Sequence, residues 1–412
     1  MVQGAFGLVA LVALAWLFSE KRRKVSLLTI AVGLGLQIVL ALLMLKVPFF
    51  EKVFLALNDV ALAIETATKA GTSFIFGYIG GGPLPFKEPY PGAGFIFAFQ
   101  ALPIILVMAA LSAVFYYWRI LPKIVQGFSW CLQRTMNVGG ALGVGAASNI
   151  FVGMVEAPLV VKPYLSKMTR SELFSLMTCG MATIAGTMLV VYASILSNVI
   201  PHAMGQILAA SIISAPAAIL ISRIMVPETE EVTQGEAIPP REASSTMDAI
   251  MHGTSDGLSI WLNVIVTIVV LVALVSLINI VMGYLPHVEG APLTLQRILG
   301  WIMAPIVWLI GIPWAEAQVA GSLMGTKTIL NEFIAYLDMA KLEPGTLSER
   351  SRIIMTYAMC GFANFGSLGI MIGGLSAMAP ERRDDIVGLG AKSIVSGTLA
   401  TLMTGAIVGM IL

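Results

Sequence analysis

The sequence contains few charged residues. Only 11% of its 412 residues are Asp, Glu, Lys or Arg, whereas 58% are hydrophobic and the mean hydropathy is +0.90. Soluble domains carry about 25% charged residues, so this composition excludes a soluble globular protein. The formal net charge is +1, which argues against nucleic acid as a partner.

Cysteine and histidine are also scarce, with three residues of each. The spacing of Cys131, Cys179 and Cys360 fits neither a disulfide framework nor a zinc site. The histidines lie near the ends of apolar segments, which argues against a histidine proton relay. The sequence also lacks a nucleophile–base pattern, a metal motif and a phosphate-binding loop. These absences disfavour a membrane enzyme.

The most prominent feature of the sequence is its long runs of apolar residues. A helix needs about 20 mainly apolar residues to span a bilayer. Eight segments have this character, at residues 2–18, 25–46, 95–118, 171–198, 203–225, 260–284, 351–379 and 387–411. Three further stretches, 49–76, 119–137 and 247–259, place charges within apolar helical patterns and predict interfacial amphipathic helices. The sequence therefore predicts an all-α polytopic membrane protein in a lipid bilayer.

The charged loops predict an orientation. The densest positive cluster is Lys21–Lys24, which the positive-inside rule assigns to the cytoplasm. With a bacterial source, this predicts an inner-membrane protein whose N- and C-termini are both periplasmic. The acidic, proline-containing stretch 226–246 predicts a disordered cytoplasmic loop.

Two stretches break the apolar pattern at membrane depth. In the first, Asn149, Glu156 and Pro158 interrupt residues 138–166, which predicts a re-entrant hairpin. The second hairpin is predicted at 297–343, with Ala304–Ile312 as one arm and Gly321–Asn331 approaching the tip. Ionisable groups at this depth usually mark a substrate or ion path.

The two stretches resemble each other. Each is followed along the chain by Cys-Gly-x-Ala, and this motif precedes Thr183 in the first half and Asn364 in the second. Paired interrupted segments indicate a transporter built from an inverted repeat, with its binding site at the breaks. We therefore divide the chain into N-terminal spans (1–137), a first repeat half (138–225), a connecting region (226–296) and a second repeat half (297–412).

The polar groups at the breaks are acidic and rich in oxygen, which suits a ligand with hydroxyl and N–H donors better than an anion. Asn149 and Thr183, with carbonyls near Val152 and Ile184, could hold a cation. Alternatives remain, because Asn149 could cap a half-helix and Thr183 could bond back to its own helix. Lys327 could serve only to neutralise a carboxylate.

Three motifs resemble the concentrative nucleoside transporters. They are Gly-x-x-Glu-Ala-Pro-Leu from Gly153, Gly-x-Lys-x-x-x-Asn-Glu-Phe-x-Ala-Tyr from Gly325, and Cys-Gly-Phe-Ala-Asn from Cys360. The resemblance extends over essentially the whole chain. It implies a homotrimer in which a transport domain carrying both hairpins moves as an elevator against a scaffold.

The resemblance also implies roles for individual residues. Glu332, Asn364 and Ser367 would bind the ribose hydroxyls, and Phe362 and Met188 would pack on the nucleoside. Gly153, Met154, Val155 and Glu156 would face the base. Asn149, Val152, Thr183 and Ile184 would form a sodium site. The expected activity is uptake of nucleosides of the uridine, cytidine or adenosine class by Na⁺ symport, with H⁺ as the alternative coupling ion.

One motif departs from the family pattern. Where the family commonly has Gly-Gln-Thr-Glu, this chain has Gly153-Met154-Val155-Glu156. Two polar positions become apolar, and apolar contacts discriminate weakly between substrates. The preference between purines and pyrimidines is therefore left open. A passive channel is a second possible function, which uphill accumulation of substrate would exclude.

Overall fold

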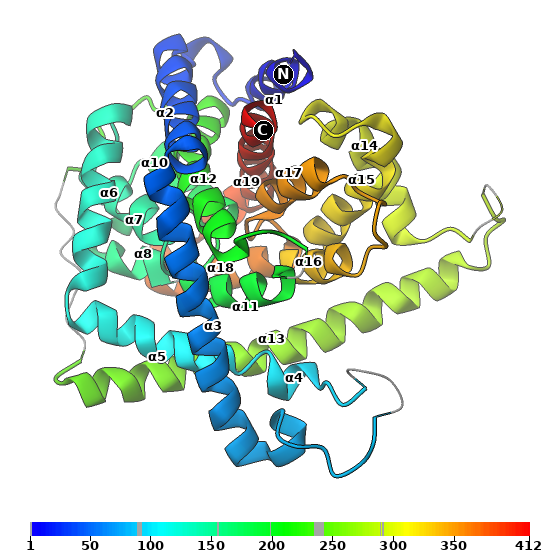
Figure 1. Ribbon diagram of the computed structural model, residues 1–412. Helices are drawn as coiled ribbons and strands as arrows, with labels where there is room; N and C mark the ends of the chain where they lie inside the picture. The colour runs from blue at the N-terminus through cyan, green and yellow to red at the C-terminus, as the bar shows by residue number, and fades with distance from the viewer. Residues whose placement is uncertain are drawn as a thin grey trace.

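The computed structural model describes residues 2–88, 93–154, 156–197, 199–234, 243–288, 290 and 292–412. None of these ranges contains a β-strand, and the helices pack into one bundle (Figure 1). This confirms the predicted all-α class. Both termini lie together at the top of Figure 1, where α1 (Val2–Leu17) packs against α19 (Arg383–Ile411).

The N-terminal helices follow the predicted segments. A short 3₁₀ turn (Arg22–Lys24) separates α1 from α2 (Leu27–Lys46), and the Ser26 side chain caps α2 by accepting from the backbone N–H of Thr29. After Val47, Pro48 begins α3 (Pro48–Phe76) at the position that best tolerates proline. Figure 1 shows α3 running on from α2.

The first half of the remaining chain contains nine helices among its described residues. They are α4 (Phe97–Gln100), α5 (Ile104–Tyr117), α6 (Ile120–Met136), α7 (Gly140–Asn149), α8 (Glu156–Val160), α9 (Lys162–Leu165), α10 (Arg170–Ala182), α11 (Gly186–Leu196) and α12 (Ala203–Met225). A 3₁₀ turn (Gly77–Gly80) precedes them. The predicted hairpin at 138–166 is confirmed, because α7 packs against α8.

The second half follows a long connecting helix, α13 (Thr246–Met282). Its other helices are α14 (Leu295–Leu309), α15 (Trp314–Ile329), α16 (Glu332–Ala340), α17 (Glu349–Met359), α18 (Phe365–Met378) and α19, with a 3₁₀ turn at Pro380–Arg382. The predicted disordered loop at 226–246 includes residues 235–242, which lie outside the described residues.

The same order of elements occurs in both halves. An amphipathic helix (α6 or α14) leads into a hairpin (α7–α9 or α15–α16), then a broken helix (α10/α11 or α17/α18), then a long helix (α12 or α19). Contacts within each half follow the same scheme, with α6 on α7 and α14 on α15. This arrangement matches the predicted internal repeat.

The repeat corrects the predicted arms of the second hairpin. The segment Ala304–Ile312 is not an arm, because most of it belongs to α14, which bends by 118° into α15. The arms are α15 and α16, and the tip lies at Leu330–Asn331. Pro305 lies inside α14 and does not end it.

The predicted boundary near residue 260 is also wrong. The stretch 247–259 and the sixth predicted span form one continuous helix, α13, which runs across the lower part of Figure 1. Gly253 and Gly257 do not break this helix but let α5 approach closely. A Cβ atom on Gly257 would lie 2.9 Å from the Cβ of Ala109. Small residues commonly permit such close packing between membrane helices.

Six helical segments of the described chain are long and apolar enough to span a bilayer. They are Leu27–Lys46, Phe97–Tyr117, Arg170–Leu196, Ala203–Met225, Thr246–Met282 and Pro380–Ile411. The other two predicted spans are the shorter α1 and the broken α17/α18. The core lies between α10, α12 and α19, whose residues are largely buried.

Candidate functional site

We call the first break the region where the tip of the first hairpin meets the interruption between α10 and α11. Asn149 is the last residue of α7, and Thr183 follows directly after α10 as its C-cap; each is 1% exposed. The Thr183 hydroxyl lies 2.9 Å from the carbonyl oxygens of both Asn149 and Cys179, so it can donate to either one. The bond to its own helix, one of the two alternatives for Thr183, is therefore available but is not its only contact.

The side-chain amide oxygen of Asn149 accepts no hydrogen bond from the described residues. Its Nδ2 donates to the carbonyl of Gly145 at 3.0 Å, which caps the end of α7. Its Oδ1 is buried and has no hydrogen-bond partner among the described residues. Buried polar atoms normally have partners, so an orphan of this kind requires an explanation. Gly180 leaves space here, because a Cβ atom on it would lie 3.5 Å from this oxygen.

Neutral oxygens therefore gather at this break. Val152 and Ile184 lie in the non-helical segments that follow α7 and α10. Among the residues described, no three His, Cys, Asp or Glu side chains cluster as they do at a transition-metal site. A carbonyl, an amide oxygen and a hydroxyl are hard donors, which suit an alkali or alkaline-earth cation.

The second break is built around a buried carboxylate. Glu332 is 4% exposed and is the first residue of α16, where the helix dipole favours a negative charge. Its Oε1 accepts from the Tyr192 hydroxyl at 2.6 Å, and its Oε2 accepts from Nδ2 of Asn364 at 3.0 Å. The Asn364 Oδ1 in turn accepts from the backbone N–H of Ser367 at 2.7 Å, which caps α18.

The two breaks lie next to each other. The backbone N–H of Phe362, in the second break, donates to the carbonyl of Thr183, in the first, at 3.3 Å. Gly361 makes this approach possible, since a Cβ atom there would lie 2.8 Å from the carbonyl oxygen of Met181. The fold thus brings residues about half the chain apart into one site.

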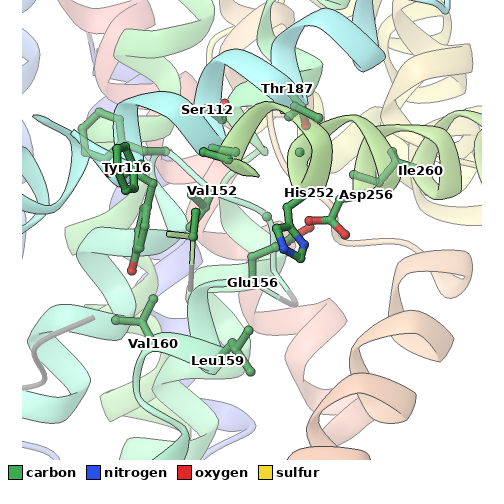
Figure 2. Close-up of a pocket in the computed structure, with 18 of the residues that line it drawn as sticks. Ser112, Tyr116, Val152, Glu156, Leu159, Val160, Thr187, His252, Asp256 and Ile260 are labelled. Atoms are coloured by element: carbon green, nitrogen blue, oxygen red, sulfur yellow. The ribbon is translucent and has the colours of Figure 1, made fainter. Parts of the chain in front are cut away.

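A cavity of about 230 Å³ opens beside the first hairpin (Figure 2). Val152, Gly153 and Glu156 line it from the hairpin. The facing wall comes from α5, α11 and α13, with Ser112, Tyr116, Thr187, His252 and Asp256 among its residues. Figure 2 shows the side chains of Glu156, His252 and Asp256 converging. Glu156 is exposed, in contrast to the buried Glu332.

Four predicted site residues either do not line the cavity or lie outside the described residues. Met154 is buried beside Gly180, Met188 is buried in α11, and Phe362 is half-buried in the second break. The described lining of the cavity contains none of these three. Val155 lies outside the described residues.

The sequence analysis missed Tyr192, which donates to Glu332. A usable signal was present, because a tyrosine in an apolar membrane helix needs a partner for its hydroxyl. The residues that α5 and α13 contribute to the cavity were also missed. No local motif shows that α13 reaches the hairpin.

Comparison with known proteins decides the family. Models of the C- and N-terminal parts of Na⁺-dependent nucleoside transporters match residues 206–409 and 6–79, and a nucleoside-recognition gate model matches residues 98–199. The chain belongs to the concentrative nucleoside transporter family. Among relatives of this transporter is nucleoside permease NupC of Helicobacter pylori, 34% identical over 98% of this chain and 96% of the relative.

Two further comparisons agree. An uncharacterised transporter of Haemophilus influenzae is 38% identical over 100% of this transporter and 97% of the relative. The solved structure of CNTnw in an inward-facing, substrate-bound state superposes with a TM-score of 0.91, at 36% identity, over 99% of this chain and 98% of that one. Structures of CNTnw variants in outward-facing and intermediate states match with TM-scores of 0.90 or 0.91.

Proposed function

We propose that this protein imports nucleosides by symport with Na⁺. We also propose that the first break binds the cation and the second break binds the ribose of the nucleoside. Family membership supports nucleoside transport coupled to a cation. The single observation that carries the finer proposal is the pairing of a buried, hydrogen-bonded carboxylate at Glu332 with an orphaned neutral oxygen at Asn149. The first suits a polyhydroxyl ligand, and the second suits a cation.

The second break would bind the ribose. A carboxylate that already accepts from Tyr192 and Asn364 retains lone pairs for the vicinal hydroxyls of a sugar. Ser367 lies within one turn of Asn364 and would contribute its own hydroxyl. The base would lie toward Gly153, Met154, Val155 and Glu156 of the first hairpin. Phe362 and Met188 would supply apolar contact.

The first break would bind Na⁺. Asn149 Oδ1 and Thr183 Oγ1 would supply side-chain oxygens, and Val152 and Ile184 would supply carbonyls from the adjacent unwound segments. Unwound carbonyls are common cation ligands in transporters of this kind. The donor set carries no formal charge, so a bound Na⁺ would keep its positive charge.

We further propose that the hairpins and broken helices of 138–225 and 297–412 move together, as an elevator, against a scaffold formed by 1–137 and 226–296. The close contact between the two breaks supports their moving as one unit. The protein would act as a homotrimer in a bacterial inner membrane. Contact between α1 and α19 agrees with both termini lying on one side, which we assign to the periplasm.

Proton coupling is the second candidate. The observation that favours it is the convergence of Glu156, His252 and Asp256 at the cavity, since these groups can exchange protons with water. Under this alternative the nucleoside site is unchanged, and the coupling step moves from Asn149 to a carboxylate.

The test is uptake of radiolabelled uridine and adenosine into proteoliposomes, with sodium and proton gradients imposed separately. Sodium-driven accumulation above the external concentration is the expected result. Accumulation driven only by protons would replace the sodium site with the carboxylate alternative. Equilibration without accumulation under either gradient, by folded protein, would contradict symport and favour a passive facilitator.

A further inference from the structure

Lys327 is a lysine that the structure buries completely. It lies in the last turn of α15, in the second hairpin, and is 0% exposed. Its Nζ makes no hydrogen bond to any described residue. Removing an ammonium group from water costs several kcal/mol unless another charge or ligand compensates it. Packing alone therefore does not explain why a lysine is buried at position 327.

The surroundings of Lys327 identify the compensating charge. Glu332 begins the next helix of the same hairpin, and the two groups interact electrostatically. No contact within 4.0 Å joins them in the described part of the chain, so they do not form a direct ion pair. The carboxylate instead accepts from two neutral donors, Tyr192 and Asn364. Those donors stabilise its negative charge without cancelling it.

The end of α15 is a favourable place for a positive charge. The helix dipole is negative at a C-terminus and positive at an N-terminus, so it stabilises Lys327 at the end of α15 and Glu332 at the start of α16. The hairpin tip thus places a basic and an acidic side chain about one helical turn of sequence apart, and with both ionised their charges sum to zero.

We propose that Lys327 is the internal counter-ion of Glu332, which makes the nucleoside site neutral when it is empty. This rests on the proposed function, in which the site crosses the membrane. An uncompensated carboxylate is costly inside a bilayer. With Lys327 present, the unloaded site crosses as a neutral unit. The loaded unit then carries only the charge of the coupling cation, because the donors at Asn149 and Thr183 are neutral.

The proposal separates two steps of the transport cycle. Net uptake requires the empty carrier to return, whereas exchange of internal for external nucleoside requires only the loaded carrier to cross. Without Lys327, the loaded unit would be neutral, since the cation balances Glu332, but the empty unit would carry one negative charge. Removing Lys327 should therefore slow net uptake far more than exchange.

The experiment measures both rates in proteoliposomes for Lys327→Met. Net sodium-driven uptake should fall by more than about tenfold, because the empty unit would then carry the uncompensated charge of Glu332 across the bilayer. Exchange at equal sodium and nucleoside concentrations should stay within about threefold, a change below the 1.4 kcal/mol that a tenfold change requires. The matched control is Lys341→Met, at an exposed lysine just after α16, which should alter neither rate.

A pH series with Lys327→Met and Lys327→Gln provides a second readout. Acidification should restore net uptake in both variants, because a protonated Glu332 needs no counter-ion. The other titratable groups around Glu332 are Tyr192 of α11, Tyr336 of α16 and Cys360 between α17 and α18. These phenols and this thiol are ordinarily uncharged in acid, so they would not produce the recovery.

Three results would overturn the proposal. Equal losses of exchange and net uptake, with weaker nucleoside binding, would make Lys327 a ligand contact. Unchanged net uptake in folded Lys327→Met and Lys327→Gln would show that Glu332 needs no counter-ion. Acid recovery that is missing in both variants would separate Lys327 from the charge of Glu332. Failure of the proposed function looks different, because the unmodified protein would then show no sodium-driven accumulation of nucleosides.

Discussion

The two repeat halves share one order of elements but differ in the chemistry of their breaks. In the first half, Asn149 and Thr183 present neutral oxygens, and the Asn149 Oδ1 accepts no hydrogen bond from the part of the chain that the structure describes. In the second half, Glu332 and Asn364 form a hydrogen-bonded pair around an acidic side chain, with Lys327 buried in the same hairpin as Glu332. The two halves thus share their order of elements but differ in the side chains at their breaks, and under the proposed function the first break would bind a cation and the second a hydroxyl-rich ligand.

The divergence is clearest at one equivalent position. After Cys-Gly-x-Ala, the first half has Thr183 and the second has Asn364. Thr183 donates to carbonyls at 2.9 Å and leaves its oxygen lone pairs available, whereas Asn364 donates to Glu332 and uses its Oδ1 to cap α18. The comparison predicts that substitutions at the first break mainly affect cation binding, and that substitutions at the second break mainly affect nucleoside binding.

The largest effect is expected at Glu332. Glu332→Ala should weaken nucleoside binding by more than about thirtyfold, since losing one partner of a buried charged hydrogen bond costs about 2–5 kcal/mol. Isothermal titration calorimetry with uridine measures this loss. Glu343→Ala, at an exposed position in the loop after α16, is the control and should bind normally. Unchanged affinity in Glu332→Ala would remove the ribose from this site.

Tyr192→Phe should give the next largest effect. It removes the 2.6 Å hydrogen bond to Glu332 and keeps the ring, and hydrogen bonds to charged groups contribute about 1.5–3 kcal/mol. Nucleoside affinity should fall about tenfold in the same titration. Tyr284→Phe, at an exposed tyrosine, is the matched control. Normal binding by Tyr192→Phe would show that Glu332 needs no support from α11.

A smaller effect is expected for base preference. The double change Met154→Gln and Val155→Thr restores the common family motif and should shift the uridine-to-adenosine affinity ratio about fivefold, the size of one hydrogen bond of about 1 kcal/mol. Competition uptake with both nucleosides measures the ratio. Because Met154 is buried beside Gly180, an unaltered ratio would mean that this position supports the hairpin and does not contact the base.

The smallest effect concerns stability and not transport. Partial burial raises the pKa of the Glu20 carboxyl, but hydrogen bonds from Arg170 and Lys392 outweigh burial and hold that pKa below its ordinary value of 4.5. A lowered folded-state pKa stabilises the protein above the unfolded-state value, and this stabilisation is lost as the pH falls through the folded-state pKa. These side chains are partly exposed, so the loss should be below about 1 kcal/mol.

Thermal unfolding in detergent between pH 7 and pH 3.5 measures this stabilisation. Glu20→Gln should unfold at a slightly lower temperature than the unmodified protein at pH 7, and the two should converge in acid. Arg170 begins α10 and also pairs with Asp385 of α19, so the network joins the two halves. A constant difference across the pH range would mean that the charge of Glu20 is not involved.

Much of the fold could be predicted from the sequence because apolar length and charge are local signals. They located the membrane helices, the first hairpin and the repeat. These signals failed at residues whose type is compatible with two different local structures. Proline commonly ends a helix, yet Pro305 lies within α14. Gly253 and Gly257 suit a helix boundary but lie within α13, where they allow close packing against α5.

The candidate site was predictable as a list of residues but not as an arrangement. The motifs gave Glu332, Asn364 and Asn149, which the structure places at the two adjoining breaks. They could not give Tyr192 as the partner of Glu332, because that contact joins residues 140 positions apart. The burial of Lys327 without a partner was equally invisible, since it depends on how α15 packs in the finished bundle.

The measurement that tests the division between the halves most directly is the sodium dependence of nucleoside affinity in the unmodified protein and in Asn149→Leu. Uridine affinity would be titrated calorimetrically in sodium chloride and in choline chloride. The division predicts that sodium tightens binding in the unmodified protein, and that Asn149→Leu binds equally in both salts, with the affinity of the sodium-free protein. Sodium dependence that survives in Asn149→Leu would contradict the account, because the cation would then bind elsewhere.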